Sequence, residues 1–267
     1  MAMAGIETAL FAEERKQRIV ELLQQQKKIV IPELCARFGV SASTIRNDLR
    51  DLQGAGMITR THGGAIIKSK SGFEPLPREK QTQMLEAKQA IAAAAARHVE
   101  EGDIIAVATG TTTYELVKLL GEKRGLTVIL NDISFAAYLE QYEDINVIVV
   151  GGTLRKNFHY LQMPPGSDFF SGINIDKVFI SCNGVHPLRG VTTPDRALAH
   201  DVRCMVDASS ELYVICDSSK IGCVTFSRIV EVNRINTLIT DDNISDSDAA
   251  DLRASEVNVE VVESGRA

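Results

Sequence analysis

The sequence contains no run of about 18 apolar residues, and its first residues lack the charged-then-apolar layout of a secretory signal. We therefore expect no membrane contact and a cytoplasmic location. The five cysteines include no Cys-x-x-Cys pair, which argues against both a disulfide framework and a zinc site. The five histidines are scattered without metal-ligand spacing, so we expect no metal and no other cofactor.

The size and the charge distribution favour two unequal domains. The chain has 267 residues and is therefore longer than one typical domain. Its hydrophobic fraction of 45% is that of an ordinary globular protein. Residues 1–70 hold eleven lysines and arginines against seven aspartates and glutamates, a net charge of +4. Because the whole chain carries −6, the remainder carries −10. A basic first domain suits contact with nucleic-acid phosphates, whereas the acidic remainder does not.

Three helices are predicted in the basic part of the chain. Apolar residues recur at helical spacing over residues 13–26. Pro32 suits the first turn of a second helix that runs to about Phe38, and Gly39 can supply the turn that ends it. Ser41 then opens a third helix after a short connection, so the second and third helices are expected to pack closely.

The third predicted helix has two different faces. Ile45, Leu49 and Leu52 fall at i, i+4 and i+7 and form a buried stripe. The opposite face carries polar side chains, namely Ser43, Arg46, Asn47 and Arg50. Two short strands are predicted after it, at 57–60 and 65–68, around a turn of the size used as a wing.

A polar helix that follows a short turn has the form needed for insertion into the major groove. Arginine can bridge the acceptors of guanine, and asparagine can pair with adenine. Lysines and wing residues would contact the DNA backbone or the minor groove. The predicted DNA-binding residues are Lys27, Lys28, Ser41, Ser43, Thr44, Arg46, Asn47, Arg50, Arg60 and His62. The alternative is a small helical domain whose charged face is only solvated.

Glycine, serine and proline interrupt every apolar period between residues 69 and 80, and this stretch predicts an interdomain linker. It separates a winged helix-turn-helix DNA-binding domain at 13–68 from a domain for effector sensing and assembly at 81–262. Residues 1–12 and 263–267 are expected to be tails. An alanine-rich helix is predicted over residues 82–99, at the start of the larger domain.

Short apolar runs alternate with helical stretches in the larger domain, which predicts an α/β fold with a mainly parallel, doubly wound sheet. The runs are 104–107, 127–130, 147–150, 178–180, 212–215, 237–239 and 257–262. In such sheets ligands bind outside the carboxyl ends of the strands. The residues that follow the runs, and that we predict to bind an effector, are Thr109, Gly110, Thr111, Thr112, Asn131, Asp132, Gly151, Gly152, Arg155, Asn183, Asp217, Ser219 and Lys220.

Each of these loops also has an ordinary explanation, because glycine and hydroxyl residues are common where a strand turns into a helix. Their convergence on one edge of one sheet favours a cleft for a small phosphorylated metabolite. A glycine- and threonine-rich turn at a helix N-terminus can hold an anion through backbone N–H groups, and Lys220 can contact a phosphate.

Two segments resemble the DNA-binding signature of the DeoR family of bacterial regulators. They are residues 40–49, Val-Ser-Ala-Ser-Thr-Ile-Arg-Asn-Asp-Leu, and residues 60–65, Arg-Thr-His-Gly-Gly-Ala. Residues 110–112, 151–155 and 217–220 resemble the sensor domain of the same family. The resemblance implies a sensor fold similar to sugar-phosphate isomerases, release of operator DNA when a phosphorylated sugar binds, and repression of carbohydrate-metabolism genes. We expect double-stranded operator DNA to be bound by a homodimer or homotetramer.

The sequence departs from the family pattern at several positions. Family members usually have a second arginine where this chain has Asn47, so the base preference there is expected to differ. In the predicted cleft, Ala108 replaces an aspartate and Leu130 replaces a threonine. Leu198 and Val202 stand where the family has a glutamate and a lysine. These replacements remove charged and hydrogen-bonding partners of a ligand, and they leave open whether ligand binding is abolished or redirected.

Two alternatives remain at this stage. An enzyme acting on sugar phosphates could use Asp132 or Asp217 as a general base and Lys220 to hold the phosphate. A helix-turn-helix serves no purpose in an isomerase, which argues against the enzyme. The other alternative is a regulator whose sensor domain serves only for assembly.

Four aromatic residues of the larger domain have two possible roles. Phe158, Tyr160, Phe169 and Phe170 could form a lid over the cleft or merely pack in the core.

Overall fold

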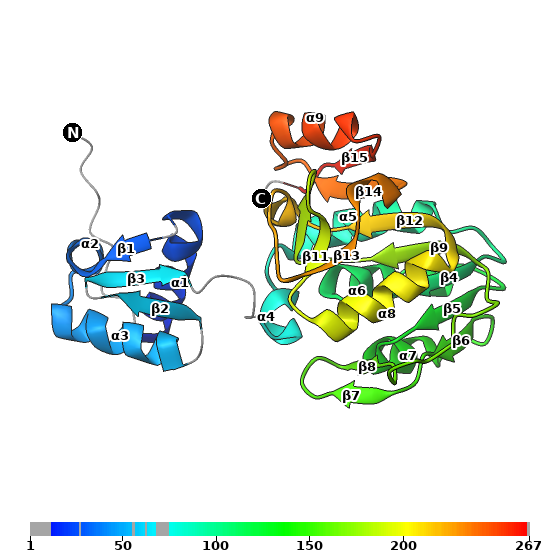
Figure 1. The fold of residues 1–267 in the computed structure, drawn as a ribbon, viewed down its shortest axis with the longest axis horizontal. Coiled ribbons are helices and arrows are strands. Elements are labelled where there is room, and N and C mark those ends of the chain that lie inside the picture. Colours follow the sequence, from blue (N-terminus) through cyan, green and yellow to red (C-terminus); the bar gives the residue numbers. More distant parts are fainter. Residues whose placement is uncertain (1–11, 27, 55–56, 62, 68–74, 266–267) are drawn as a thin grey trace. The chain divides into compact units, whose positions relative to one another are not determined.

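The computed structural model describes residues 12–26, 28–54, 57–61, 63–67 and 75–265 (Figure 1). The chain forms two compact units, Met1–Phe73 and Glu74–Ala267. In the part of the chain that is described, no helix is long and apolar enough to cross a membrane.

The first unit packs three helices against a small antiparallel sheet. Its elements are α1 (Ala12–Gln26), β1 (Lys28–Val30), α2 (Ile31–Phe38), α3 (Ala42–Gly54), β2 (Ile58–Thr61) and β3 (Gly64–Ile67), with sheet order β1-β3-β2. The three predicted helices and the hairpin of the wing are confirmed, and β1 adds a third strand. Gly39 adopts φ 64 and donates its N–H to the Cys35 carbonyl, as the predicted end of α2 requires.

The second unit is built on a seven-stranded sheet in which every pairing is parallel. The strand order is β15-β14-β12-β9-β4-β5-β6. The strands are β4 (Ile104–Val107), β5 (Thr127–Leu130), β6 (Asn146–Val149), β9 (Ile175–Ile180), β12 (Ser209–Ile215), β14 (Thr237–Asp241) and β15 (Asn258–Val262). The seven apolar runs of the sequence thus correspond to these seven strands.

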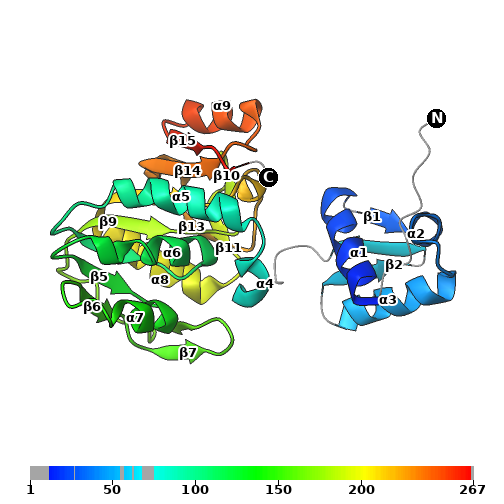
Figure 2. The same cartoon turned by 180° about the vertical axis from the view of Figure 1, so that it is seen from behind.

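Helices cover both faces of this sheet. α5 (Leu85–Arg97), α6 (Thr111–Val117) and α7 (Ile133–Leu139) contribute to one buried cluster, and α8 (Arg196–Asp207) and α9 (Asp246–Ala254) to the other. Figure 1 shows α8 in front of the sheet. Figure 2, the view from behind, shows α5 and α6 in front of the opposite face of the sheet. The doubly wound arrangement predicted from the sequence is confirmed.

Several elements were not expected. β7 (Thr153–Arg155) and β8 (Tyr160–Gln162) form a hairpin, and β10 (Gly184–His186), β11 (Gly190–Thr193) and β13 (Ser227–Val230) form a small antiparallel sheet. A short helix, α4 (Pro77–Gln81), lies in the stretch expected to be irregular, and α5 begins only at Leu85. Pro77 starts α4, and Glu79 accepts the N–H of Leu76, so local capping explains the helix.

Candidate functional sites

Helix α3 presents a polar face to solvent. Ser43, Arg46, Asn47 and Arg50 are exposed, whereas Ile45, Leu49 and Leu52 are buried in the core of the first unit. Ser41 lies at the start of the helix, where its hydroxyl accepts the N–H of Thr44 at 3.2 Å. The predicted division of α3 into a buried and an exposed face is therefore confirmed.

A buried ion pair fixes the rotation of α3 about its axis. Asp48 is only 4% exposed and accepts two hydrogen bonds from Arg15 of α1, from Nε at 2.6 Å and from Nη2 at 3.1 Å. The hydrogen bond to Asp48 raises the pKa of the Arg15 guanidinium, so the guanidinium stays charged. Because Asp48 must face inward, its neighbours Arg46, Asn47 and Arg50 face outward.

The wing hairpin of β2 and β3 carries Arg60, which is exposed. A Cβ at Gly64 would lie 2.0 Å from the Ile29 carbonyl oxygen, so β1 and β3 require glycine at this position. Among the predicted contacts to the DNA backbone, Lys27 and His62 lie outside the described residues. Lys28 pairs with Ile66 through its strand, and its side chain is outside the described part.

The second unit contains a cavity of about 290 Å³ at the carboxyl ends of its central strands. Thr109 follows β4, Asp132 follows β5, Cys182 follows β9 and Asp217 follows β12. The predicted effector residues that line the cavity are Thr109, Gly110, Thr111, Thr112, Asp132, Asn183, Asp217, Ser219 and Lys220. The strand order of the sheet brings these loops together although they are far apart in the sequence.

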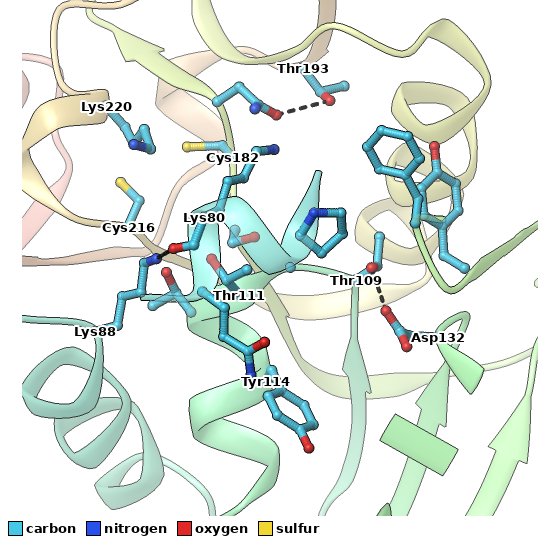
Figure 3. A pocket seen from close by; sticks show the side chains of 18 of the residues that line it. Lys80, Lys88, Thr109, Thr111, Tyr114, Asp132, Cys182, Thr193, Cys216 and Lys220 are labelled. Carbon is cyan, nitrogen blue, oxygen red and sulfur yellow. Dashed lines mark hydrogen bonds between the residues drawn. The ribbon is translucent and has the colours of Figure 1, made fainter. Parts of the chain in front are cut away.

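One side of the cavity is a basic corner, formed by Lys80, Lys88 and Lys220 (Figure 3). Lys88 of α5 is 4% exposed, and its ammonium group donates to the Lys80 carbonyl oxygen. Burial lowers the pKa of Lys88 to about 8, even though Asp217 lies close enough to oppose the shift. Lys220 Nζ lies 2.8 Å from Ser219 Oγ and 3.4 Å from an oxygen of Asp217. This corner suits an anion.

The threonine-rich turn after β4 packs tightly beside the basic corner. A Cβ at Gly110 would lie 1.8 Å from the Ser181 hydroxyl oxygen, so only glycine fits this turn. Thr113 donates its hydroxyl to the Gly110 carbonyl, and α6 begins at Thr111. The first backbone N–H groups of a helix lack partners within it, so those of Thr111 and Thr112 are available for a bound oxyanion.

The two carboxylates considered as general bases are held in loops by their neighbours. Asp132 accepts the Thr109 hydroxyl at 2.5 Å and the N–H of Ser134 at 2.8 Å, where it caps α7. Asp217 accepts the N–H and hydroxyl of Ser219. Both side chains thus shape the loops that they occupy.

Four predicted effector residues do not line the cavity. Asn131 lies behind the turn and accepts the N–H of Thr109 at 3.1 Å. Gly151 and Gly152 come directly before the β7–β8 hairpin. Gly152 has φ 152, and a Cβ at Gly152 would lie 1.9 Å from the Gln162 carbonyl oxygen. Arg155 of β7 bonds Tyr160 Oη at 2.7 Å and pairs with Asp195 at 3.2 Å. Direct ligand contact by these residues stays a prediction.

Part of the remaining cavity wall is apolar, and polar side chains such as Gln81, Ser134 and His159 line the rest of it. Phe158, Tyr160, Leu198, Val202 and Ile229 line the apolar part and belong to or pack against one buried hydrophobic cluster. This set, called the apolar wall below, includes two of the four departures from the family pattern that were expected in the cleft, Leu198 and Val202. The other two departures, Ala108 and Leu130, are buried in the sheet and do not line the cavity.

The sequence analysis missed two kinds of site residue. Lys88 lies among Ala87, Ile91 and Ala92 on the buried stripe of α5, and a lysine within an apolar helical stripe was the available signal. Asp241 holds the loop at 217–220 from β14, accepting the N–H of Ser218 at 2.6 Å. Burial alone would raise the pKa of Asp241, but hydrogen bonds from Ser218 and Asn243 lower it.

A helix-turn-helix with an exposed polar helix, followed by a second unit with a small-molecule cavity, defines the class of two-domain DNA-binding regulators. Comparison with protein families agrees. Residues 15–71 match the DeoR-like helix-turn-helix domain, and residues 83–242 match the DeoR C terminal sensor domain. The chain belongs to the DeoR family of transcription regulators.

Several named relatives span most of the chain. The HTH-type transcriptional regulator GlpR of Haloferax volcanii is 32% identical, covering 92% of this chain and 96% of its own. The HTH-type transcriptional regulator GolR of Listeria innocua is 33% identical, over 88% of this chain and 93% of its own. The transcriptional repressor AccR of Agrobacterium fabrum is 29% identical, over 86% of this chain and 89% of its own. These relatives are regulators, so the enzyme alternative has no support from them.

Solved structures show only distant likeness. Ribose 5 phosphate isomerase A from Neisseria gonorrhoeae matches with a TM-score of 0.40 and 18% identity, over 53% of this chain and 55% of that protein. The eIF2B beta structure from Chaetomium thermophilum matches with a TM-score of 0.43 and 13% identity, over 85% and 63%. Likeness at this level carries no functional argument.

Proposed function

We propose that this protein represses carbohydrate-metabolism genes and that a small phosphorylated metabolite, a sugar phosphate or a related compound, modulates its affinity for operator DNA. The observation that carries the proposal is the basic corner beside the turn at 109–112. A phosphate monoester has strong acceptor oxygens and close to two negative charges at neutral pH. It would satisfy the backbone N–H groups of Thr111 and Thr112 and the ammonium groups of Lys88 and Lys220 together.

The exposed face of α3 supports the DNA-binding half of the proposal. Arg46 and Arg50 can each bond a guanine edge bidentately, and Asn47 can bond an adenine edge. Ser41, Ser43 and Thr44 lie at the start of the helix, where hydroxyl groups can reach phosphates. We infer that a homodimer or homotetramer reads two half-sites, because a single α3 covers too few base pairs for a specific operator.

Gel-shift titration with DNA from the neighbourhood of the protein's own gene tests this half. Arg46→Ala is expected to weaken specific binding by about 1 to 3 kcal/mol, which is roughly five- to 150-fold. Arg18→Ala is the matched control, because it removes the same charge from an exposed position of α1. If no fragment is retained at low salt, or if the two variants behave alike, α3 does not read DNA.

A thermal-shift screen of phosphorylated sugars and inorganic phosphate tests the sensing half. A ligand that binds only the folded state raises the melting temperature, and Lys220→Ala should abolish the rise. Ligands that raise it are then added to the gel shift, where they should release the DNA. Silence across a broad panel would favour the alternative in which the second unit serves only for assembly.

A further inference from the structure

The cavity joins two surfaces of different chemistry. The basic corner lies beyond β12, where α5 packs against β12 and β14. Tyr160 lies at the other side, bridged to Asp132 beyond β5. Three strand spacings, about 14 Å, separate the ends of β12 and β5. Figure 3 shows this separation, with Lys88 and Lys220 on one side and Asp132 on the other. A ligand anchored at the corner therefore extends its body toward the apolar wall.

Several polar groups near the apolar wall have partners in the protein. The Tyr160 hydroxyl accepts from Arg155 and donates to Asp195 at 3.0 Å. Thr193 donates to Asn183 at 3.3 Å. Asp132 is occupied by Thr109 and Ser134. Asn183 and His159 also line the cavity, and beside them Leu198, Val202 and Ile229 offer a ligand carbon surface.

This surface is a poor match for a sugar chain. Each hydroxyl that faced Leu198, Val202 or Ile229 would lose its hydrogen bonds to water without gaining a new one, which weakens binding. A flat or apolar ligand body would instead gain free energy, because its apolar surface is removed from water. The volume of about 290 Å³ lies at the small end of ligand sites, so one ring and one phosphate suffice to fill it.

We infer that the cavity selects a phosphate monoester whose body is apolar or aromatic, and discriminates against polyhydroxylated sugar phosphates. The inference rests on the proposed function, since it assumes a phosphorylated ligand at the basic corner. The inference narrows the proposed function, because contact with the apolar wall determines which phosphate esters bind tightly.

Calorimetric titration of the full chain tests the inference with a series that differs only in the body. The ligands are inorganic phosphate, ribose 5-phosphate, benzyl phosphate and pyridoxine 5′-phosphate, with benzyl alcohol as the ligand without phosphate. We expect the two aromatic esters to bind at least tenfold more tightly than ribose 5-phosphate, and benzyl alcohol not to bind. The alcohol fails because it cannot use the basic corner.

The combined change Leu198→Asn and Val202→Thr places polar groups on the apolar wall at nearly constant volume. It should reduce the preference for benzyl phosphate over ribose 5-phosphate to less than threefold. Val206→Thr is the matched control, because Val206 is buried in the same helix and does not line the cavity. It should leave the preference unchanged, even if both variants lose stability.

The rate of alkylation of Cys182 tests where the ligand binds. Cys182 lines the cavity and is half-buried, and Cys35 is half-buried in the first unit. Benzyl phosphate should slow the alkylation of Cys182 and leave that of Cys35 unchanged, as read by mass spectrometry. Equal protection of both thiols, or of neither, would place the ligand elsewhere and overturn the inference.

The outcomes separate the inference from the proposal beneath it. Equal or tighter binding of ribose 5-phosphate overturns the inference while the phosphorylated effector stands. Binding of benzyl alcohol as tight as that of benzyl phosphate overturns both, because the phosphate then contributes nothing. The absence of binding by every phosphate in the series also overturns both.

Discussion

Two buried charged side chains are accommodated in opposite ways. Asp48 is paired bidentately with Arg15, so its charge is compensated within the first unit. Lys88 donates to a neutral carbonyl, and burial lowers its pKa to about 8. A buried charge without full compensation is costly, and binding sites concentrate such groups. The pair at Asp48 therefore has a structural role, whereas Lys88 is suited to meet an incoming anion.

The lowered pKa of Lys88 makes phosphate binding dependent on pH. A bound phosphate favours the ammonium form, so affinity should fall as the pH rises from 7 through about 8 to 9, where free Lys88 becomes neutral. Calorimetric titration with benzyl phosphate across this range measures the fall, because a phosphate monoester ionises a second time at about pH 6 and changes its own charge little above pH 7. Lys88→Arg stays charged and should show a flat profile.

The same shift has a consequence for stability without ligand. Between pH 8 and 10.5 the folded state binds fewer protons than the unfolded state, so the stability of the second unit should rise with pH in that window. The contribution of Lys88 is the difference in unfolding free energy between the native protein and Lys88→Met. If this difference fell as the pH rises through that window, the lowered pKa of Lys88 would be contradicted.

Removal of one member of the Arg15–Asp48 pair should destabilise the first unit. Asp48→Ala leaves a buried guanidinium without its partner, at a cost of about 3 kcal/mol. Hydrogen exchange of the α3 amides should then accelerate on the order of a hundredfold. The double variant Arg15→Met, Asp48→Leu should recover much of the protection, because it removes both charges. Equal loss in the single and double variants would show that packing, not charge, matters there.

At the scale of elements, the turn between β4 and α6 is the least replaceable part of the cavity. Gly110→Ala would push a methyl group into the Ser181 hydroxyl and displace the Thr111 and Thr112 N–H groups. We expect phosphate affinity to fall at least tenfold while specific DNA binding persists, because α3 belongs to the other unit. Gly102→Ala is the control, since its Cβ would meet no atom within 4 Å, so that any loss it causes comes from its φ of 82 and not from a contact at the cavity.

Elements differed in how well the sequence predicted them. β4 and β5 were predicted to the residue, because uninterrupted apolar runs are typical of strands buried on both faces. The β7–β8 hairpin was missed, because Thr153 and Leu154 are exposed and three-residue strands show no periodicity. Its geometry depends on Gly152, whose close approach to Gln162 is a tertiary contact.

At the scale of the whole molecule, the chain has separate hydrophobic cores. One cluster belongs to the first unit, and two lie on the faces of the parallel sheet. We expect two unfolding transitions, and a phosphate ligand at a hundred times its Kd should raise the stability of the second unit by about 2.7 kcal/mol. Hydrogen exchange of β4 and β9 should report that gain, with the α3 amides unchanged. A single transition that moves as a whole would contradict this expectation.

The sites were predictable where they follow from topology. A parallel sheet places the residues after its strands at one edge, which located Thr109, Asp132 and Asp217. Lys88 lies on a helix before the first strand of the sheet, so no rule about strand ends could include it. In the apolar wall, Leu198 and Val202 were assigned to the cleft through the resemblance to the family, whereas Ile229, which reaches the cavity only through tertiary packing, was not predicted.

The inward-facing Asp48 separates two demands on helix α3. Folding depends on Ile45, Asp48, Leu49 and Leu52, while the exposed positions between them contribute little to the core. Surface substitutions of that kind usually change stability by less than about 0.5 kcal/mol. Descendants of this chain can therefore acquire new operators by changing exposed positions such as Asn47, without first having to recover a lost fold.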